Sequence, residues 1–215
     1  MPLLFHRTLM PAGELGVWRT EEDEWFFRTR LPLTAAETAY IDSIPGAGRR
    51  KEWVASRYLL HKMSGRAVRG TVLKDEYGKP HLEDSDWQIS LSHTRRYVAV
   101  LAGPELCGVD IQVLVPKIER LAPKFMRPEE SASLQPATRL EHLHVYWGAK
   151  EALYKAYGRR QLDFRENILV TPFAYDLETG RTAGAVVKDD LLLEFEIYYE
   201  KIGDTVLVTA VEGEV

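Results

Sequence analysis

The chain lacks the residues and segments that define several protein classes. Cys107 is its single cysteine, which excludes an internal disulfide framework and a zinc site built from several cysteines. No apolar run approaches the roughly 18–20 residues that a helix needs to cross a bilayer. The N-terminal segment turns polar too early for a secretion signal, and low-complexity linkers are absent. These absences favour a soluble, cytoplasmic protein with no membrane partner.

The composition is that of an ordinary globular protein, but the charge is unevenly distributed. Hydrophobic residues make up 45% of the 215 residues, enough for a core without disulfides or metals. Lys and Arg number 28 against 32 Asp and Glu, and the net charge of −4 argues against nucleic acid as a partner. Eight of the basic residues nevertheless lie between Arg49 and Lys74, where Glu52 is the one acid. This block is either a solvated helix face or a site for an anionic ligand.

Hydrophobic periodicity predicts an α+β fold, because helical and strand patterns do not alternate regularly along the chain. Thr34–Ser43 predicts a short helix that begins with a capping box of Thr34 and Glu37. Two longer helices are expected over Arg49–Met63 and Thr138–Tyr157, each ended by a glycine. The other expected elements are a hairpin over Glu14–Phe27, a strand pair over Ile89–Leu101, strands over Cys107–Val113, Leu191–Tyr199 and Thr205–Val211, and brief helices over Ile118–Ala122 and Pro128–Leu134.

A faint internal repeat indicates that the two halves of the chain are related. Trp53–Leu59 and Trp147–Leu153 share Trp, Ala and Leu at an offset of 94 residues (147 − 53). Ile89–Ala102 and Ile197–Ala210 share a strand-pair pattern at an offset of 108 residues (197 − 89). We therefore expect pseudo-two-fold duplicated lobes over residues 1–104 and 105–215, each an antiparallel sheet packed against a long helix.

Two stretches carry carboxylates and amines suited to chemistry. Asp110 lies in an apolar strand pattern, where a buried carboxylate needs a cation, a cap or solvent; a turn contact on an edge strand is the alternative. Glu151 and Lys155 stand one helical turn apart, and with Lys150 they border the aromatic side of their helix. They form either a surface ion pair or a site for metal-bound phosphate, since carboxylates ligate Mg²⁺ and ammonium groups balance phosphoryl charge.

A third stretch places Ser92 and His93 at the tip of the expected strand pair, where they offer donors to an anion. His93 is a core histidine, a metal ligand or a phosphate donor. With no partner His or Cys at ligand spacing, zinc is disfavoured.

Together these stretches resemble the 4′-phosphopantetheinyl transferases, in particular the longer, surfactin-synthetase-type class of two-lobed monomers. The resemblance spans Arg49 to about Gly158, and its signature pair is Asp110 and Glu151, 41 residues apart (151 − 110). It implies an Mg²⁺-dependent enzyme that moves the phosphopantetheine arm of coenzyme A to a serine of an apo acyl or peptidyl carrier protein and releases 3′,5′-ADP. The motifs that carry the resemblance are Tyr77-Gly-Lys-Pro80, Ile89-Ser-Leu-Ser-His93, Gly108-Val-Asp-Ile111 and Trp147-Gly-Ala-Lys-Glu-Ala-Leu-Tyr-Lys155.

The resemblance also implies a role for each candidate residue. Asp110 and Glu151 would bind Mg²⁺ or Mn²⁺, and Glu151 would take the proton of the attacking serine. Lys155 and His93 would neutralise charge during the transfer. The cofactor contacts would be Lys155 and Lys150 at the pyrophosphate of coenzyme A, Ser92 and His93 at a phosphate, Lys79 and Pro80 at the adenine side, and Arg57 with Arg49 or Arg50 at the 3′-phosphate.

One departure from the family pattern affects the expected metal site. Family members often carry a second acid two residues after the first, but this chain has Gln112 there. Gln112 would ligate the metal through its amide oxygen or through water. It is also the best argument for the alternative interpretation, a coenzyme A-binding or regulatory homologue that has lost catalysis.

The expected partner is an acidic carrier protein that docks on a monomeric enzyme. A candidate docking surface is Val113–Arg127, and an ordinary amphipathic connector is the equal alternative. In that segment the basic residues Lys117, Arg120, Lys124 and Arg127 surround Leu121, Phe125 and Met126.

Overall fold

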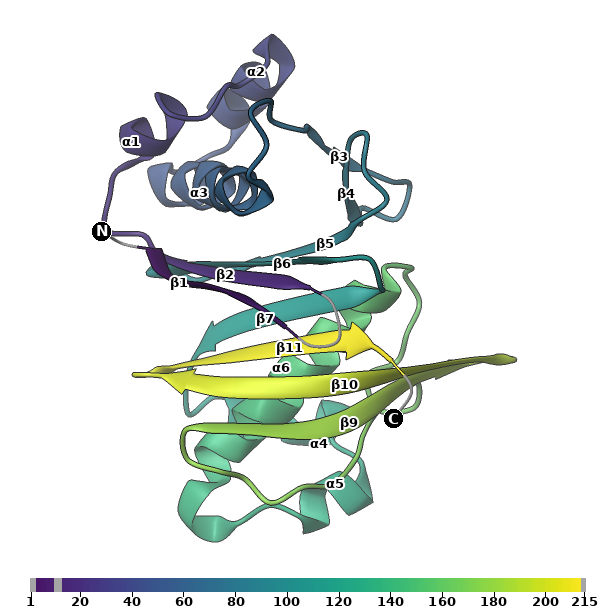
Figure 1. The fold of residues 1–215 in the computed structure, drawn as a ribbon. Coiled ribbons are helices and arrows are strands. Elements are labelled where there is room, and N and C mark those ends of the chain that lie inside the picture. The colour runs from purple at the N-terminus through teal and green to yellow at the C-terminus, as the bar shows by residue number, and fades with distance from the viewer. Residues whose placement is uncertain (1–2, 10–12, 214–215) are drawn as a thin grey trace.

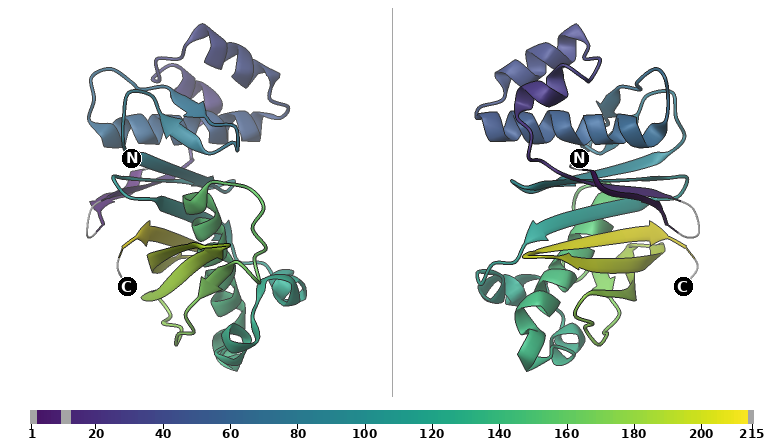
Figure 2. Two further views of the ribbon diagram at one scale, coloured as in Figure 1. Left: turned by 90° about the vertical axis from the view of Figure 1, so that its right-hand side faces the viewer. Right: turned by 60° about the vertical axis from the view of Figure 1, so that its left-hand side comes forward.

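The computed structural model describes residues 3–9 and 13–213 and has four layers. Helices cover a first antiparallel sheet, which packs on a second antiparallel sheet, and further helices cover the other side of the second sheet (Figure 1). The two turned views in Figure 2 show the same layering, with each group of helices on the outer side of its sheet. The expected α+β class is confirmed. Each sheet is packed against one long helix. The predicted duplication and the predicted lobe boundary stay predictions.

The first sheet is built from strands before residue 104. Its central strand β6 (Tyr97–Gly103) alternates between two cores: Val98 and Val100 face the helices, while Ala99 and Leu101 face the second sheet. In spatial order the strands are β1 (Leu3–Thr8), β2 (Glu14–Arg19), β6, β5 (Gln88–His93), β4 (Pro80–Leu82) and β3 (Val72–Lys74).

Three helices cover the outer face of this sheet: α1 (Glu24–Arg28), α2 (Ala35–Ser43) and α3 (Ala47–Ser64). The predicted capping box at Thr34 and Glu37 is present at the start of α2. The long helix α3 matches the predicted helix, and Gly65 ends it in the left-handed conformation that glycine adopts without strain.

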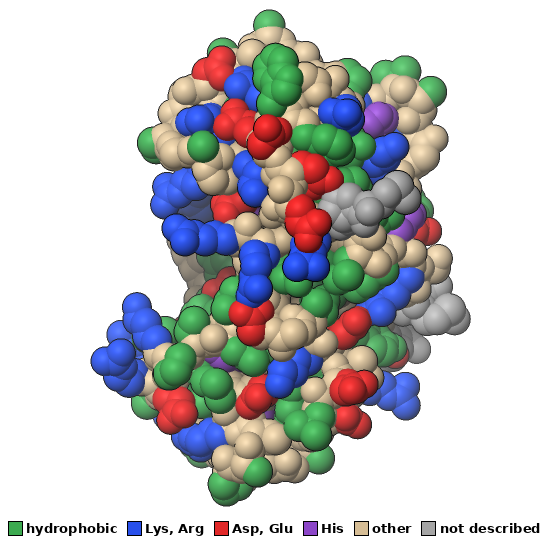
Figure 3. All heavy atoms as spheres, turned by 90° about the vertical axis from the view of Figure 1, so that its left-hand side faces the viewer, with side chains coloured by type: hydrophobic (Ala, Val, Ile, Leu, Met, Phe, Trp, Pro, Cys, Tyr) green, Lys and Arg blue, Asp and Glu red, His purple; other side chains and the backbone are tan. Residues whose placement is uncertain are grey.

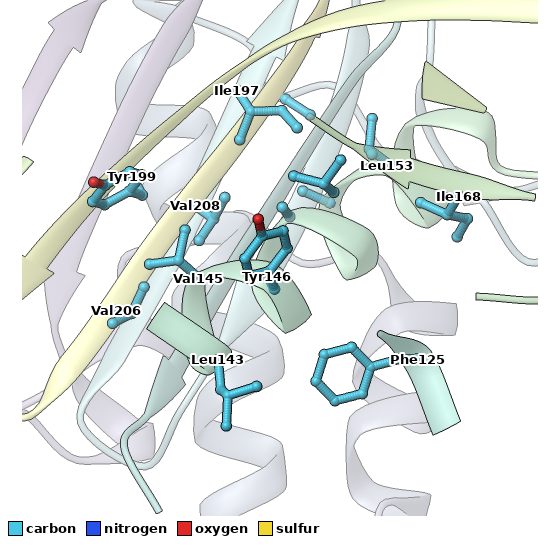
Figure 4. Packing of buried hydrophobic residues seen from close by; sticks show 14 of the residues in the cluster. Phe125, Leu143, Val145, Tyr146, Leu153, Ile168, Ile197, Tyr199, Val206 and Val208 are labelled. Atoms are coloured by element: carbon cyan, nitrogen blue, oxygen red, sulfur yellow. The ribbon is translucent and has the colours of Figure 1, made fainter. Parts of the chain in front are cut away.

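The second sheet and its helices form the other half. In spatial order its strands are β7 (Cys107–Val113), β11 (Thr205–Glu212), β10 (Leu191–Ile202), β9 (Thr179–Lys188) and β8 (Ile168–Val170). The long helix α6 (Arg139–Tyr157) packs across it, beside α4 (Ile118–Phe125), α5 (Pro128–Ala132) and a short 3₁₀ turn (Pro136–Thr138). Figure 4 shows the core that results, with Tyr146 and Leu153 of α6 against strand residues such as Val208 and Ile197.

The two sheets meet through a third core. Leu15 and Leu101 of the first sheet pack against Val109, Ile111 and Leu207 of the second. Cys107 lies in the same interface, and burial raises the pKa of its thiol to about 12. Among the described residues, no helix combines the length and the apolar character that a membrane crossing requires.

One predicted element is wrong. Glu14–Phe27 is not a hairpin: β2 ends at Arg19, and Glu24–Arg28 forms α1. Asp23 caps this helix by accepting a hydrogen bond from the backbone N–H of Phe26 (2.8 Å), and Phe27 is fully buried under α3. The strand partners of β2 are instead β1, which sequence periodicity did not reveal, and the distant β6.

Candidate active site

Strand β7 presents one face to helix α6 and the other to the first sheet. Val109 and Ile111 belong to the core between the sheets. Because side chains alternate along a strand, Gly108, Asp110 and Gln112 lie on the opposite face, toward α6.

Two glycines allow α6 to approach β7 very closely. A Cβ atom built on Gly108 would lie 1.8 Å from the backbone oxygen of Ala152, so no larger residue fits there without moving the helix. A Cβ atom on Gly148 would lie 2.9 Å from Nε2 of Gln112. Asp110 lies between these two contact points on the strand, and the helix therefore runs directly over its carboxylate.

Asp110 is buried, with 8% of the residue exposed, and its carboxylate accepts three hydrogen bonds. Lys155 Nζ donates to Oδ1 at 2.8 Å, and Ser92 Oγ donates to the same oxygen at 3.0 Å. Gln112 Nε2 donates to Oδ2 at 3.0 Å. An ammonium and two polar donors therefore hold this carboxylate in place within the protein.

Glu151 lies on α6 beside Asp110, and no hydrogen bond or ion pair joins its carboxylate to another described residue. Burial raises its pKa above the usual range, and repulsion from the negative Asp110 raises it further, while Lys155 lowers it. That the two acids share one metal site stays a prediction. A partly buried carboxylate beside a second one, without a donor of its own, suits a hard cation such as Mg²⁺.

The described residues contain no cluster of three or more His, Cys, Asp and Glu side chains that would bind a metal alone. A cation at this site would therefore be held by the two carboxylates and by oxygens of a bound phosphate. This is a common way for proteins to bind Mg²⁺.

Gln112 does not offer an oxygen to this site. Nδ1 of His144 lies 2.9 Å from Oε1 of Gln112, and Nε2 lies near both the amide nitrogen (2.9 Å) and the carbonyl oxygen (3.2 Å) of Val115. The amide NH₂ of Gln112 then faces two acceptors, Asp110 Oδ2 and the backbone oxygen of His144 (3.2 Å). In this arrangement Gln112 is a hydrogen-bond donor to Asp110, and its role as a metal ligand stays a prediction.

Ser92 and His93 take separate positions. Ser92 is 6% exposed, and its hydroxyl bonds to Asp110, Lys155 and a backbone amide. His93 is exposed, with Nδ1 3.1 Å from the Glu52 carboxylate, and its ring is open to a ligand. The structure therefore separates the pair: His93 is accessible to a phosphate, and the Ser92 hydroxyl is engaged within the protein.

The two predicted phosphate lysines also differ. Lys155 uses its three ammonium protons on Asp110, Ser92 and the backbone oxygen of Val109, at 2.8, 3.1 and 2.9 Å, and its side chain is 28% exposed. It therefore contributes positive charge beside the two acids.

Lys150 is fully buried. Its ammonium lies 2.9 Å from Glu130, which is also fully buried, and donates to the backbone oxygens of Phe164 and Ile168. Its ammonium has no exposed surface through which it could contact a ligand in this structure.

A basic cavity of about 170 Å³ adjoins Lys155 at the boundary of the two halves. Lys79 lies on one side of it and is tied to the C-terminal end of α6, where Nζ donates to the backbone oxygen of Ala156 (2.7 Å). Burial lowers the pKa of this ammonium. Pro80, Tyr154, Arg159 and Arg160 also line the cavity, which therefore combines cations with apolar surface. Lys79 and Pro80 thus lie at the same cavity, and their place at the adenine side of coenzyme A stays a prediction.

The predicted 3′-phosphate residues do not converge on this cavity. Arg57 is buried, with its guanidinium 4.1 Å from the centre of the Trp53 ring, and burial lowers its pKa to about 10. Arg50 pairs with Glu24 at 2.9 Å, and Arg49 is exposed. The role of all three at a 3′-phosphate stays a prediction.

The predicted docking segment has a buried centre. Phe125 and Met126 are 1% and 4% exposed and belong to the core of the second half, so they are not the centre of a surface patch. The segment contributes α4 and presents exposed Lys117, Arg120 and Lys124. This arrangement fits the amphipathic alternative.

Sequence reasoning missed His144, Glu130 and the two arginines that follow Gly158. His144 and Glu130 carry no motif, and only the folded contacts reveal what they bind. Arg159 and Arg160 stand in the segment that follows the signature lysine, and their position there was the available signal.

Residues 106–197 match the model of the 4′-phosphopantetheinyl transferase superfamily. The match contains Asp110, Glu151 and Lys155 and covers less than half of the chain. It supports a phosphopantetheinyl transferase activity in general. No curated protein matches the chain.

Proposed function

We propose that the protein transfers the 4′-phosphopantetheine arm of coenzyme A to a serine of an apo acyl or peptidyl carrier protein, with Mg²⁺ as cofactor. The observation that carries this proposal is the close contact of β7 with α6, which brings Asp110, Lys155 and the helix turn that carries Glu151 together next to a basic cavity. The superfamily match over residues 106–197 supports it. The surface in Figure 3 has Lys and Arg side chains above and below an indentation between the two halves, which favours an anionic ligand on that side.

In the proposed reaction the carrier serine oxygen attacks the β-phosphorus of coenzyme A. A bond forms between that oxygen and phosphorus, the bond from phosphorus to the oxygen of 3′,5′-ADP breaks, and the serine proton leaves. The cation would neutralise charge on the diphosphate, as in other phosphoryl transfers. Asp110 and Glu151 would hold it, Lys155 would add positive charge beside the phosphates, and the ring of His93 would contact a phosphate.

Glu151 is our candidate for the group that accepts the serine proton. Burial and the neighbouring Asp110 raise its pKa, which brings the carboxylate closer to the range in which a general base works near neutral pH. Unlike Asp110, it carries no hydrogen bond from a described residue that would have to break first.

The proposed acceptor is an acidic carrier protein, and the exposed Lys117 before α4 and Arg120 and Lys124 within it offer charge for a transient contact. Since Phe125 and Met126 are buried, this contact would be mainly electrostatic. We propose that the protein acts as a monomer.

The main prediction concerns Glu151→Gln. The variant keeps the shape of the side chain but loses a carboxylate oxygen for the cation and the proton acceptor, so transfer should fall at least about 100-fold, a typical loss for general-base removal. Coenzyme A binding should survive, because Lys79, Pro80 and the arginines of the cavity are unchanged. The measurement is intact-mass spectrometry of a panel of apo-carriers incubated with coenzyme A, Mg²⁺ and either protein.

Wild-type protein should add the arm to at least one carrier, and chelation of the metal should prevent it. Undiminished transfer by Glu151→Gln would remove Glu151 from the mechanism.

A second candidate is a coenzyme A-binding or regulatory protein without transfer activity. The observation that favours it is Gln112, which donates to Asp110 where an acid would add a metal ligand. Coenzyme A binding by wild-type protein without modification of any carrier would support this candidate.

A further inference from the structure

Strand β7 is the edge of the second sheet, and two serines of β5 in the first sheet bond to it. Val109 N–H donates to Ser90 Oγ at 3.0 Å, and Ile111 N–H donates to Ser92 Oγ at 3.1 Å. These backbone donors are buried and need partners, and two hydroxyls take the place of the carbonyls that another strand would supply. The serines therefore join the two sheets at the strand that carries Asp110.

Ser92 differs from Ser90 in what else its hydroxyl contacts. It accepts a second hydrogen bond from Lys155 Nζ (3.1 Å), so Ile111 N–H and the ammonium occupy both of its lone pairs. Its single proton is thereby directed to Asp110 Oδ1, 3.0 Å away. No hydrogen bond among the described residues joins Ser90 to a carboxylate or an amine.

We infer that Ser92 is a positioning residue that fixes the orientation of the Asp110 carboxylate for the cation site. Ile111 N–H and the Lys155 ammonium direct the hydroxyl proton of Ser92 to Asp110, and this hydrogen bond holds the carboxylate in one orientation. This inference rests on the proposed function, because orientation matters only where Asp110 holds a cation. It also assigns Ser92 to the protein scaffold instead of the phosphate contact that the resemblance implies.

Ser92→Ala and Ser90→Ala form a matched pair that tests this role. Each variant leaves one buried β7 amide without its acceptor, so both should lower the midpoint of urea unfolding by a similar amount. Only Ser92→Ala should weaken Mn²⁺ binding, by about 10-fold or more, as is usual when a partner of a metal ligand is removed. Mn²⁺ is titrated by electron paramagnetic resonance at saturating coenzyme A, and coenzyme A affinity is measured separately without metal. Ser92→Thr, which keeps the hydroxyl, should restore Mn²⁺ affinity.

The outcomes separate this inference from the proposed function. If Asp110→Asn abolishes Mn²⁺ binding but Ser92→Ala binds it as tightly as Ser90→Ala does, the positioning role is wrong and the cation site stands. If Ser92→Ala weakens metal-free coenzyme A binding and leaves Mn²⁺ affinity intact, Ser92 is a phosphate contact and the positioning role is again wrong. If wild-type protein binds no Mn²⁺, the proposed function itself fails.

Discussion

Several ionisable side chains of this protein are held deep inside it, and their neighbours decide what each can do. Lys150 and Glu130 form a buried ion pair with each other. Glu130 also accepts hydrogen bonds from the backbone N–H groups of Arg127 (2.8 Å) and Val170 (3.1 Å). This pair ties α5, α6 and β8 together. A lysine one position before the signature Glu151 therefore supports the fold, although its place in the motif predicted a contact with the cofactor.

His142 is a second ionisable side chain whose surroundings determine its behaviour. The ring is fully buried between Tyr146, Phe173 and Tyr175, with ring centres 5.1, 4.6 and 5.7 Å away, and neither ring nitrogen has a hydrogen-bond partner among the described residues. The titratable groups that face it are the two tyrosines. Burial lowers the pKa of His142 to about 4.

We predict that the protein loses stability as the pH falls below neutrality because of His142. Its folded-state pKa is below the unfolded value of about 6.5, so the unfolded state binds the proton more readily. As the pH falls from about 6.5 toward about 4, protonation stabilises the unfolded state and the free energy of unfolding decreases. At pH 5 the expected loss is about 2 kcal/mol relative to pH 7.5.

Urea unfolding of wild-type protein and His142→Phe at both pH values measures this loss. The variant should retain only a smaller pH dependence, from groups such as His144, whose pKa burial also lowers. Equal losses in wild-type protein and the variant would contradict the assignment to His142.

At the scale of elements, the site depends on how closely α6 lies on β7. Gly108 leaves room for the backbone oxygen of Ala152, and Gly148 leaves room for Val208 and Gln112. This proximity allows a strand residue and a helix residue to form one pair of acids.

Gly108→Ala should therefore harm both the fold and the site. The added Cβ would meet a backbone oxygen at 1.8 Å, and a helix backbone cannot rotate away as a side chain can. We expect a loss of about 3 kcal/mol in the free energy of unfolding, at the upper end of overpacking effects, together with weaker Mn²⁺ binding.

The matched control is Gly48→Ala in α3, where a Cβ has no neighbour within 4 Å. This substitution should stabilise the helix by about 0.5–1 kcal/mol. A Gly108→Ala variant as stable as wild-type protein would show that α6 does not lie as close to β7 as described.

Elements that are marked by caps, terminal glycines or a continuous strand pattern could be predicted from the sequence. The capping box of α2, the glycine ends of α3 and α6, and the bounds of β7 follow from nearby residues, and all are confirmed. The hairpin prediction over Glu14–Phe27 failed because the partners of β2 come from elsewhere in the chain. Periodicity also gave no signal for short strands such as β8.

At the scale of the whole molecule, the site is assembled from both halves. Asp110 and Glu151 belong to the second half, whereas Ser92 reaches Asp110 from the first sheet. The sequence motifs predicted which residue types gather, because each motif is local. They could not predict that Ser92 and Gln112 would bond to Asp110, since that depends on the packing of two sheets and a helix.

The central claim is that Asp110 and Glu151 hold one cation between them. The most direct test is a double-mutant cycle in which Mn²⁺ affinity is measured at saturating coenzyme A for wild-type protein, Asp110→Asn, Glu151→Gln and the double variant. If both carboxylates bind the same ion, each single substitution should weaken binding by at least about 10-fold. The double variant should then be only slightly weaker than the single ones, because the effects of residues that share a ligand do not add. Additive losses, or single variants that bind Mn²⁺ as wild-type protein does, would contradict the account.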